Sequence, residues 1–399
     1  MPPKQQAQPA QKERVILGRV KNHLCMGIVG LPNVGKSTLF NALTKCQVSA
    51  QNFPFCTIDP NEARVAVPDE RFEYLCDHFK PASKVAAALQ VTDIAGLVKG
   101  AADGEGLGNA FLSHIKAVDG IYQVVRVFED EDIVHVEGDV NPVRDMEIIL
   151  NELCLKDEET ISNRIESLTK SNQHRRDKTV LKEIECLKKC LAMVQEKKPI
   201  RFNEWTDEEA GFINNVLPLT AKPMIYLVNM CENDFMRKRN KWLMKIKTWI
   251  ETKCAPFQMD PIIPYCGCMV AKEVDAATAA RASESTDSGI LAAGALARIV
   301  STGYSTLNLI HFFTSGHDEV KCWTIRRGTK APQAAGTIHT DFEKGFVCAE
   351  VMTFNDFKEY GSEQEVKLQG KYKQEGRNYV VNDGDIIFFR ANTSGLKKK

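Results

Sequence analysis

The feature that most constrains the fold is an eight-residue motif near the N-terminus. Residues 30–37 are Gly-Leu-Pro-Asn-Val-Gly-Lys-Ser, a full match to the G-x-x-x-x-G-K-[ST] phosphate-binding loop. An apolar run of strand length, residues 24–29, precedes this loop, and residues 38–43 favour a helix after it. In that order, backbone N–H groups gather at the positive end of the helix, where phosphates bind. The sequence therefore predicts an α/β domain that binds a nucleoside triphosphate.

Two motifs predict how the phosphates and a magnesium ion are held. In the phosphate-binding loop, we expect Lys36 to contact the β- and γ-phosphates as a catalytic residue and the Ser37 hydroxyl to ligate Mg²⁺. Downstream, a D-x-x-G motif from Asp93 to Gly96 follows the apolar run 85–91. At the end of a strand, Asp93 would lie beside Mg²⁺, usually through water, and the Gly96 N–H would sense the γ-phosphate.

A threonine between these motifs is a candidate for the first switch. Thr57 lies in the Pro-flanked segment 53–60, about twenty residues after Ser37. In that position its hydroxyl would complete the Mg²⁺ shell. The alternative is that Thr57 only caps a turn.

The base is expected to be recognised after a later strand, residues 224–228. The next residues are Asn229-Met230-Cys231-Glu232, where ordinary GTPases carry Asn-Lys-x-Asp. Their aspartate accepts hydrogen bonds from guanine N1–H and the 2-amino group, and Glu232 is one methylene too long for that edge. Adenine presents N7 and a 6-amino group, which the Asn229 side chain can satisfy. The pattern therefore favours ATP over GTP.

The sequence lacks the side chain that usually orients the attacking water in GTPases. The position after D-x-x-G is Leu97, a hydrocarbon, so we expect slow intrinsic turnover and a catalytic group supplied from elsewhere. His135, in an acidic loop after the apolar run 121–128, is the candidate we favour. His114 is the alternative, although a histidine on a helix is more often a packing or surface residue.

Several motifs together resemble the Obg-like ATPases of the translation-factor class of P-loop GTPases. They are G-L-P-N-V-G-K-S-T-L-F-N-A-L, N-F-P-F-C-T-I-D-P-N, D-I-A-G-L-V-K-G-A, G-E-G-L-G-N-A-F-L and N-x-x-E. Residues 331–346, A-P-Q-A-A-G-T-I-H-T-D-F-E-K-G-F, resemble the family's C-terminal TGS domain. The resemblance covers about residues 20 to 390 and departs at Met230 and Cys231, where many members carry other residues.

The resemblance implies an activity, partners and contacts. It implies a Mg²⁺-dependent enzyme that hydrolyses ATP in preference to GTP and associates with ribosomes, through the large or both subunits. It favours a loop histidine such as His135 in turnover, and it places Asn229 and Met230 at the base. Ser37 and Thr57 would bind Mg²⁺. The implied phosphate contacts are Asn33, Val34, Gly35, Lys36, Ser37 and Thr38.

The 399 residues are too many for one core, so we expect several domains. A disordered tail, 1–20, precedes an OBG-type G domain at 21–303 with a helical insertion at 138–205. The insertion is predicted from two amphipathic stretches, 143–165 and 180–194, separated by a basic polar segment. Short strands after residue 303 predict a small β-grasp (TGS) domain at 304–390, and a basic tail follows at 391–399.

Composition limits the partners. Lys plus Arg and Asp plus Glu are 52 each, so RNA could bind only through local patches, at Arg175–Arg176, residues 237–241 and the terminal lysines. The sequence has no eighteen-residue apolar run, so no membrane span is expected, and the 13 cysteines lack a C-x-x-C pair. We therefore expect a cytoplasmic monomer that acts as a nucleotide-dependent switch on the translation apparatus. The alternative is a ribosome- or RNA-associated scaffold whose bound nucleotide is structural and rarely hydrolysed.

Overall fold

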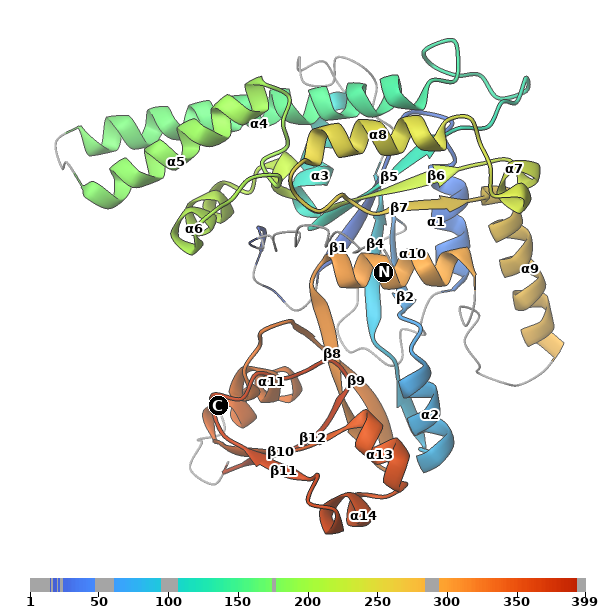
Figure 1. Ribbon diagram of the computed structural model, residues 1–399, viewed down its shortest axis with the longest axis vertical. Helices are drawn as coiled ribbons and strands as arrows, with labels where there is room; N and C mark the ends of the chain where they lie inside the picture. Colours follow the sequence, from blue (N-terminus) through green and yellow to red (C-terminus); the bar gives the residue numbers. More distant parts are fainter. Residues whose placement is uncertain are drawn as a thin grey trace, which may run out of the picture. The chain divides into compact units, whose positions relative to one another are not determined.

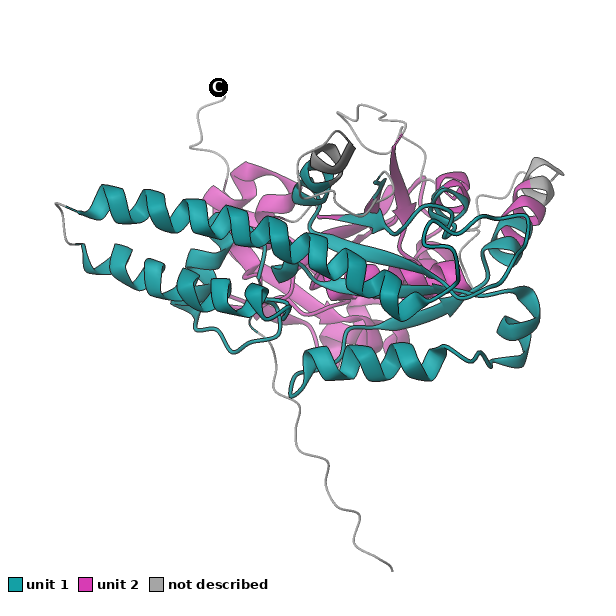
Figure 2. Ribbon diagram, turned by 90° about the horizontal axis from the view of Figure 1, so that it is seen from above, with its two compact units in different colours: residues 1–20, 26–40, 92–272 teal, residues 21–25, 41–91, 273–399 magenta. Residues whose placement is uncertain are grey.

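The computed structural model describes residues 15, 17–19, 21, 24–46, 61–94, 107–173, 177–283 and 294–392 (Figure 1). Contacts divide the chain into two compact units (Figure 2). The first contains residues 1–20, 26–40 and 92–272, and the second contains 21–25, 41–91 and 273–399. Some predictions lie outside the described residues, namely those for Thr57, Gly96, Leu97, Arg175, Arg176 and most of the two tails. Within the tail 1–20 that was predicted to be disordered, residues 15 and 17–19 are described, and Leu17 is buried, which contradicts disorder there.

The first sheet has six strands in the order β2-β4-β1-β5-β6-β7. Strand β1 pairs with β5, β5 with β6 and β6 with β7, all in parallel. Strands β5 and β6 are buried along their whole length, as their continuous apolar sequences require. The predicted α/β class is confirmed. The strands are β1 Cys25–Val29, β2 Glu62–Ala66, β4 Ala88–Asp93, β5 Gly120–Arg126, β6 Met224–Asn229 and β7 Ile262–Tyr265.

Helices follow the carboxyl ends of these strands. They include α1 Lys36–Lys45, α3 Leu107–Ala117, α7 Glu232–Arg237, α8 Leu243–Cys254 and α9 Gly267–Ser283. Parallel strands have their carboxyl ends at one edge of the sheet, where ligands of α/β proteins bind. Asp93 is the last residue of β4 and Asn229 the last of β6, so the fold brings both motifs to that edge.

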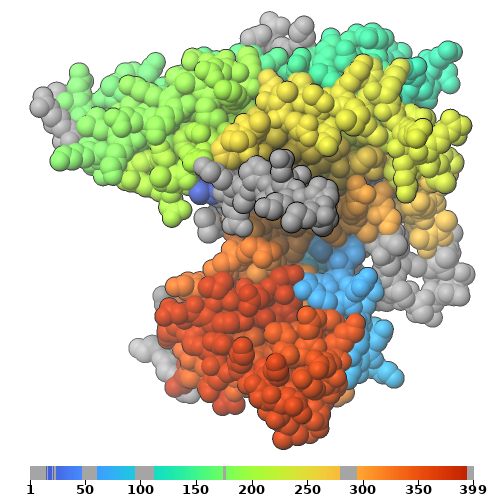
Figure 3. Space-filling model, viewed as in Figure 1, coloured from blue at the N-terminus to red at the C-terminus, as the bar shows by residue number. Residues whose placement is uncertain are grey.

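A long helical hairpin, here called the arm, projects from the first unit. It consists of α4 Pro142–Asn172 and α5 Lys178–Gln195, which lie side by side and appear green in Figures 1 and 3. Asn141 caps α4 by accepting the Arg144 N–H, and Pro142 occupies the first turn, where no N–H partner is needed. Ile161 and Leu187 are fully buried in the apolar cluster of the arm. The predicted helical hairpin is confirmed. It is followed by α6 Asp207–Val216 and the short 3-10 helix η3 Leu219–Ala221.

The second sheet has the order β11-β10-β12-β8-β9-β3. Its core packs against α11, whose Ala331, Ala334 and Ala335 are fully buried beside Phe312. The strands are β3 Ser83–Val85, β8 Leu309–Ser315, β9 Glu319–Arg326, β10 Phe346–Thr353, β11 Lys373–Glu375 and β12 Asp385–Ala391. The helices of this unit include α2 Glu70–Phe79, α10 Ala295–Thr306, α11 Ala331–Ile338, α12 Thr340–Lys344, α13 Phe354–Tyr360 and α14 Glu363–Leu368.

One early segment of the chain joins this C-terminal sheet. Strand β3 pairs in parallel with β9, and Ser83 lies opposite Glu319. The preceding α2 is attached through its cap, because Asp69 lies 2.7 Å from His311 Nε2. The predicted boundary at residue 303 therefore separates segments that pack together in the second unit.

Across the described ranges, no helix is long and apolar enough to cross a membrane. Every cysteine within those ranges is free.

Candidate nucleotide-binding site

The phosphate-binding loop joins β1 to α1 and has the backbone that the motif predicts. Asn33 and Gly35 have φ values of +62° and +99°, in the left-handed region that glycine adopts readily. A Cβ at Gly35 would overlap Asn229 Nδ2, and one at Gly30 would overlap the Val124 carbonyl. Both glycines are therefore required for the close approach of the loop to its neighbours.

Lys36 begins α1 and is buried, with 8% of its surface exposed. Its Nζ donates to the carbonyls of Gly30, at 3.1 Å, and Leu31, at 2.9 Å, so the ammonium group lies within the curve of the loop. Burial lowers the pKa of Lys36, and the nearby Asp93 carboxylate opposes that shift. Ser37 and Thr38 are exposed at the N-terminal end of the helix, where an anion is favoured. This arrangement presents a cation, two hydroxyls and a helix N-terminus to a phosphate group.

Asp93 provides a test of whether the residues fit a magnesium ion. Its Oδ1 is buried and, among the described residues, has no hydrogen-bond partner. Burial raises the pKa of Asp93, and Lys36 opposes that shift. A buried carboxylate oxygen without a partner fits the oxygen ligands that Mg²⁺ prefers, and so does the exposed Ser37 hydroxyl. The donor chemistry is therefore suitable for the ion at Ser37 and Asp93.

Asn229 connects three loops at the carboxyl edge of the sheet. Its Nδ2 donates to the Val34 carbonyl, and its Oδ1 accepts the Gly267 N–H, each at 3.0 Å. The side chain is buried, with 5% exposed. An asparagine amide has two hydrogens and two lone pairs, so one of each is left for a purine. Asn229 therefore holds the site together, a role that the sequence-based interpretation of adenine recognition did not include.

The other residues of the base motif differ in exposure. Met230 is buried, and its N–H donates to the Tyr265 carbonyl at 2.9 Å. Glu232 is exposed and forms an ion pair with Lys272 of α9 at 3.3 Å. No sequence pattern singled out Lys272, because it lies 40 residues beyond Glu232.

His135 lies in the loop after β5, and both of its ring nitrogens are engaged. Nε2 lies 3.0 Å from Asp145 Oδ2, and Nδ1 accepts the Glu137 N–H at 3.2 Å. The neighbouring Val134 carbonyl accepts a hydrogen bond from Asn33 of the phosphate-binding loop at 3.1 Å. His135 is therefore placed to hold a loop against the phosphate site, and its effect on turnover stays a prediction. His114 is exposed on α3.

Comparisons with known proteins agree with this geometry. Residues 25–164 match the family described as 50S ribosome-binding GTPase, and residues 309–392 match the YchF-GTPase C-terminal family, described as a protein of unknown function (DUF933). The chain is 54% identical to Obg-like ATPase 1 of Xenopus laevis and to that of Homo sapiens, and each match covers 100% of both chains. The solved Schizosaccharomyces pombe YchF GTPase superimposes with a TM-score of 0.82 at 47% identity, covering 94% of this chain and 100% of that one. Identity at this level over the full length shows that the chain belongs to the Obg-like ATPase (YchF) family of nucleotide-hydrolysing enzymes.

Proposed function

We propose that the protein is a Mg²⁺-dependent ATP hydrolase that prefers ATP to GTP and acts as a nucleotide-dependent switch on ribosomes. The observation that carries the base preference is the position of Glu232 in the base motif and its ion pair with Lys272. Its carboxylate pairs with Lys272 on α9, and it replaces the shorter aspartate that GTPases use for guanine. Leaving the guanine donors without this partner costs about 1–3 kcal/mol, enough to favour ATP about tenfold or more.

The names of the relatives support nucleotide hydrolysis but differ on whether the nucleotide is ATP or GTP, which an experiment must decide. The vertebrate relatives are called Obg-like ATPase 1, whereas the S. pombe protein of known structure is called a GTPase. In our proposal Lys36 binds the β- and γ-phosphates, and Ser37 and Asp93 hold Mg²⁺, Asp93 through water. The bound ion would neutralise charge on the phosphates. Because Leu97 cannot orient water, we expect turnover to be slow until another group is supplied.

Ribosome association is proposed from a family description and a surface. The matched family at residues 25–164 is described as ribosome-binding. On the first unit, Arg237 ends α7 and is exposed, as are the following Lys238 and Arg239. The segment that contains α7 and α8 is yellow in Figure 3. Among the described residues, no carboxylate forms an ion pair with these three cations. A protein of zero net charge binds RNA through a local patch of this kind. A cytoplasmic location and a monomeric state belong to the same proposal.

Steady-state hydrolysis with and without ribosomes tests the proposal against the scaffold alternative. A switch should hydrolyse ATP slowly alone and faster with ribosomes, and the Lys36→Ala variant should do neither. A scaffold with a structural nucleotide would show no ribosome-dependent turnover and would retain its nucleotide through purification.

A further inference from the structure

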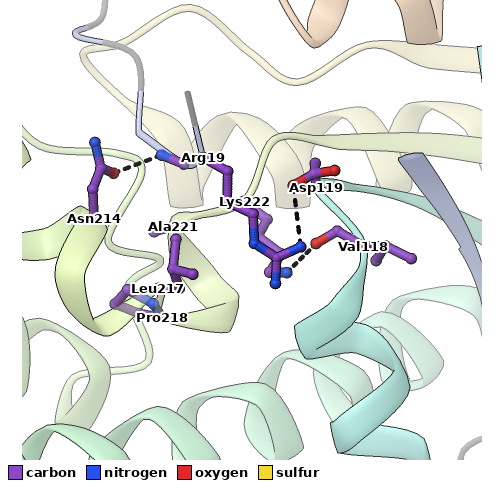
Figure 4. Close-up of a pocket in the computed structure, with 9 residues that line it drawn as sticks. Arg19, Val118, Asp119, Asn214, Leu217, Pro218, Ala221 and Lys222 are labelled. Atoms are coloured by element: carbon purple, nitrogen blue, oxygen red, sulfur yellow. Dashed lines mark hydrogen bonds and ion pairs between the residues drawn. The ribbon is translucent and has the colours of Figure 1, made fainter. Parts of the chain in front are cut away.

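A second polar cluster lies at the edge of the first sheet opposite the nucleotide. Strands β5 and β6 begin there, at Gly120 and Met224, whereas the phosphate-binding loop follows the carboxyl end of the parallel strand β1. The cluster surrounds a cavity of about 20 Å³, drawn in Figure 4. Arg19 and Lys222 extend toward Val118 and Asp119 at this place. Its position, far from the phosphates, excludes direct contact with the reacting atoms.

Two cations hold the C-terminal end of α3. Lys222 is buried, and its Nζ donates to the carbonyls of Ile115, at 2.8 Å, Lys116, at 3.1 Å, and Val118. Arg19 donates to the carbonyls of Ala117, at 2.6 Å, and Lys116, at 2.9 Å. The last carbonyls of a helix lack partners within the helix and carry partial negative charge. Both cations therefore fix the end of α3 where it turns into β5.

The same end is connected to the arm. Lys222 follows η3, and the carboxylate of Asp157, from α4, accepts the backbone N–H groups of η3. Asp157 Oδ1 accepts from Leu219 at 2.6 Å, and Oδ2 accepts from the Thr220 N–H and hydroxyl, both at 2.7 Å. Asp157 is 1% exposed, so these bonds are shielded from water. A continuous buried polar chain thus runs from the arm through η3 and Lys222 to α3.

The position of α3 explains why this series of polar contacts matters for hydrolysis. The helix follows the D-x-x-G motif that begins at Asp93, and its 11 residues span about 16 Å. We propose that Lys222 is a positioning residue for nucleotide hydrolysis, which fixes the far end of α3 and couples it through η3 to Asp157 of the arm. A partner that shifts the arm would then shift α3 and alter turnover. The inference holds for whichever nucleotide the enzyme hydrolyses.

Steady-state hydrolysis at saturating nucleotide by Lys222→Met, with Lys188→Met on the exposed face of α5 as the matched control, tests the positioning role. Misplacing a catalytic element by about 1 Å can lower its rate about 100-fold, so we expect kcat to fall about 10- to 100-fold. The nucleotide Kd should stay within about twofold, because no phosphate contact is lost. Hydrogen exchange at residues 112–117 should accelerate. A merely structural lysine would change folding without this selective loss of kcat.

Arg19→Met tests the same end of α3 if Lys222→Met does not fold, because Arg19 is partly exposed. A folded variant of either residue with wild-type kcat would overturn the positioning role. A double-mutant cycle with Asp157→Asn tests the coupling to the arm. If the polar contacts from Asp157 through η3 to Lys222 act as one unit, the double variant should be no slower than Lys222→Met alone. Fully additive losses in kcat would overturn the coupling.

Discussion

The imidazole Nε2 of His135 lies 3.0 Å from Oδ2 of Asp145, and both side chains are buried. This pair joins the loop after β5 to the first turn of α4, while the adjacent Val134 carbonyl is held by Asn33. Burial raises the pKa of Asp145, and His135 opposes that shift. This buried pair therefore helps to hold the loop beside the phosphate site, together with Asn33 and with Arg126, which donates to the Ile133 carbonyl at 3.0 Å.

Replacing His135 by Ala should lower turnover while leaving nucleotide binding within about twofold, because the phosphate contacts remain. Single-turnover rates and equilibrium titration measure the two effects. The Asp145→Asn variant tests whether His135 affects turnover by holding the loop. A loop-holding role predicts that Asp145→Asn loses turnover as well, whereas wild-type turnover in His135→Ala would remove His135 from the mechanism.

Loss of the Lys36 ammonium or the Ser37 hydroxyl should remove productive Mg²⁺–nucleotide binding without unfolding the protein. A hydrogen bond to a charged group contributes about 1.5–3 kcal/mol, so Lys36→Ala should weaken binding about 10- to 100-fold. Titration with a fluorescent nucleotide measures this, and Lys188→Ala serves as the control. Unchanged binding and hydrolysis in both folded variants would refute the assignment of the phosphate site.

The pH dependence of stability should report on Asp157. Burial raises the pKa of Asp157 to about 6, while its bonds to η3 and the charge of Lys222 oppose the shift. An acid with a raised folded-state pKa binds its proton more tightly when folded, so its contribution to stability falls as pH rises through the window from about 4 to 6. The stability advantage of wild type over Asp157→Asn should shrink across this window and then stay constant. Urea unfolding at several pH values measures it, and an advantage that grows with pH would show that the shift has the opposite sign.

Binding to ribosomes should depend on the exposed cations at the end of α7, Arg237, Lys238 and Arg239. Reversing Arg237 and Arg239 to Glu should weaken co-sedimentation and reduce the slope of log affinity against log salt by about 2 or more, because fewer counterions are released. Lys371→Glu with Lys373→Glu, exposed on the second unit, is the matched control. Association that does not respond to salt or to these charges would place the ribosome contact elsewhere.

The parts of the site that were predictable from the sequence are local. The phosphate-binding loop, Asp93 and Asn229 each lie within a few residues of a strand end, and parallel strands bring such ends together. The hairpin of α4 and α5 followed from helical periodicity over many residues. These features could be predicted because each depends on residues that are close together in the sequence.

The remaining features depend on pairings that are distant in sequence. Strand β3 has three residues, too few for a clear alternation, and it joins the C-terminal sheet through β9. His135 and Asp145 are ten residues apart, but their pairing depends on how the loop between them folds. Lys222 is a single lysine before a strand, and its carbonyl partners lie more than 100 residues earlier. Neither composition nor spacing distinguishes such a lysine from an exposed one.

Side-by-side equilibrium titration of ATP and GTP in the presence of Mg²⁺ tests the central claim most directly. Wild type should bind ATP about tenfold or more tightly than GTP, because Glu232 cannot replace the guanine-binding aspartate. Met230→Lys with Glu232→Asp should shift the ratio toward GTP, and Cys231→Ala, exposed between them, should leave it unchanged. A wild-type preference for GTP of tenfold would contradict the account of residues 229–232.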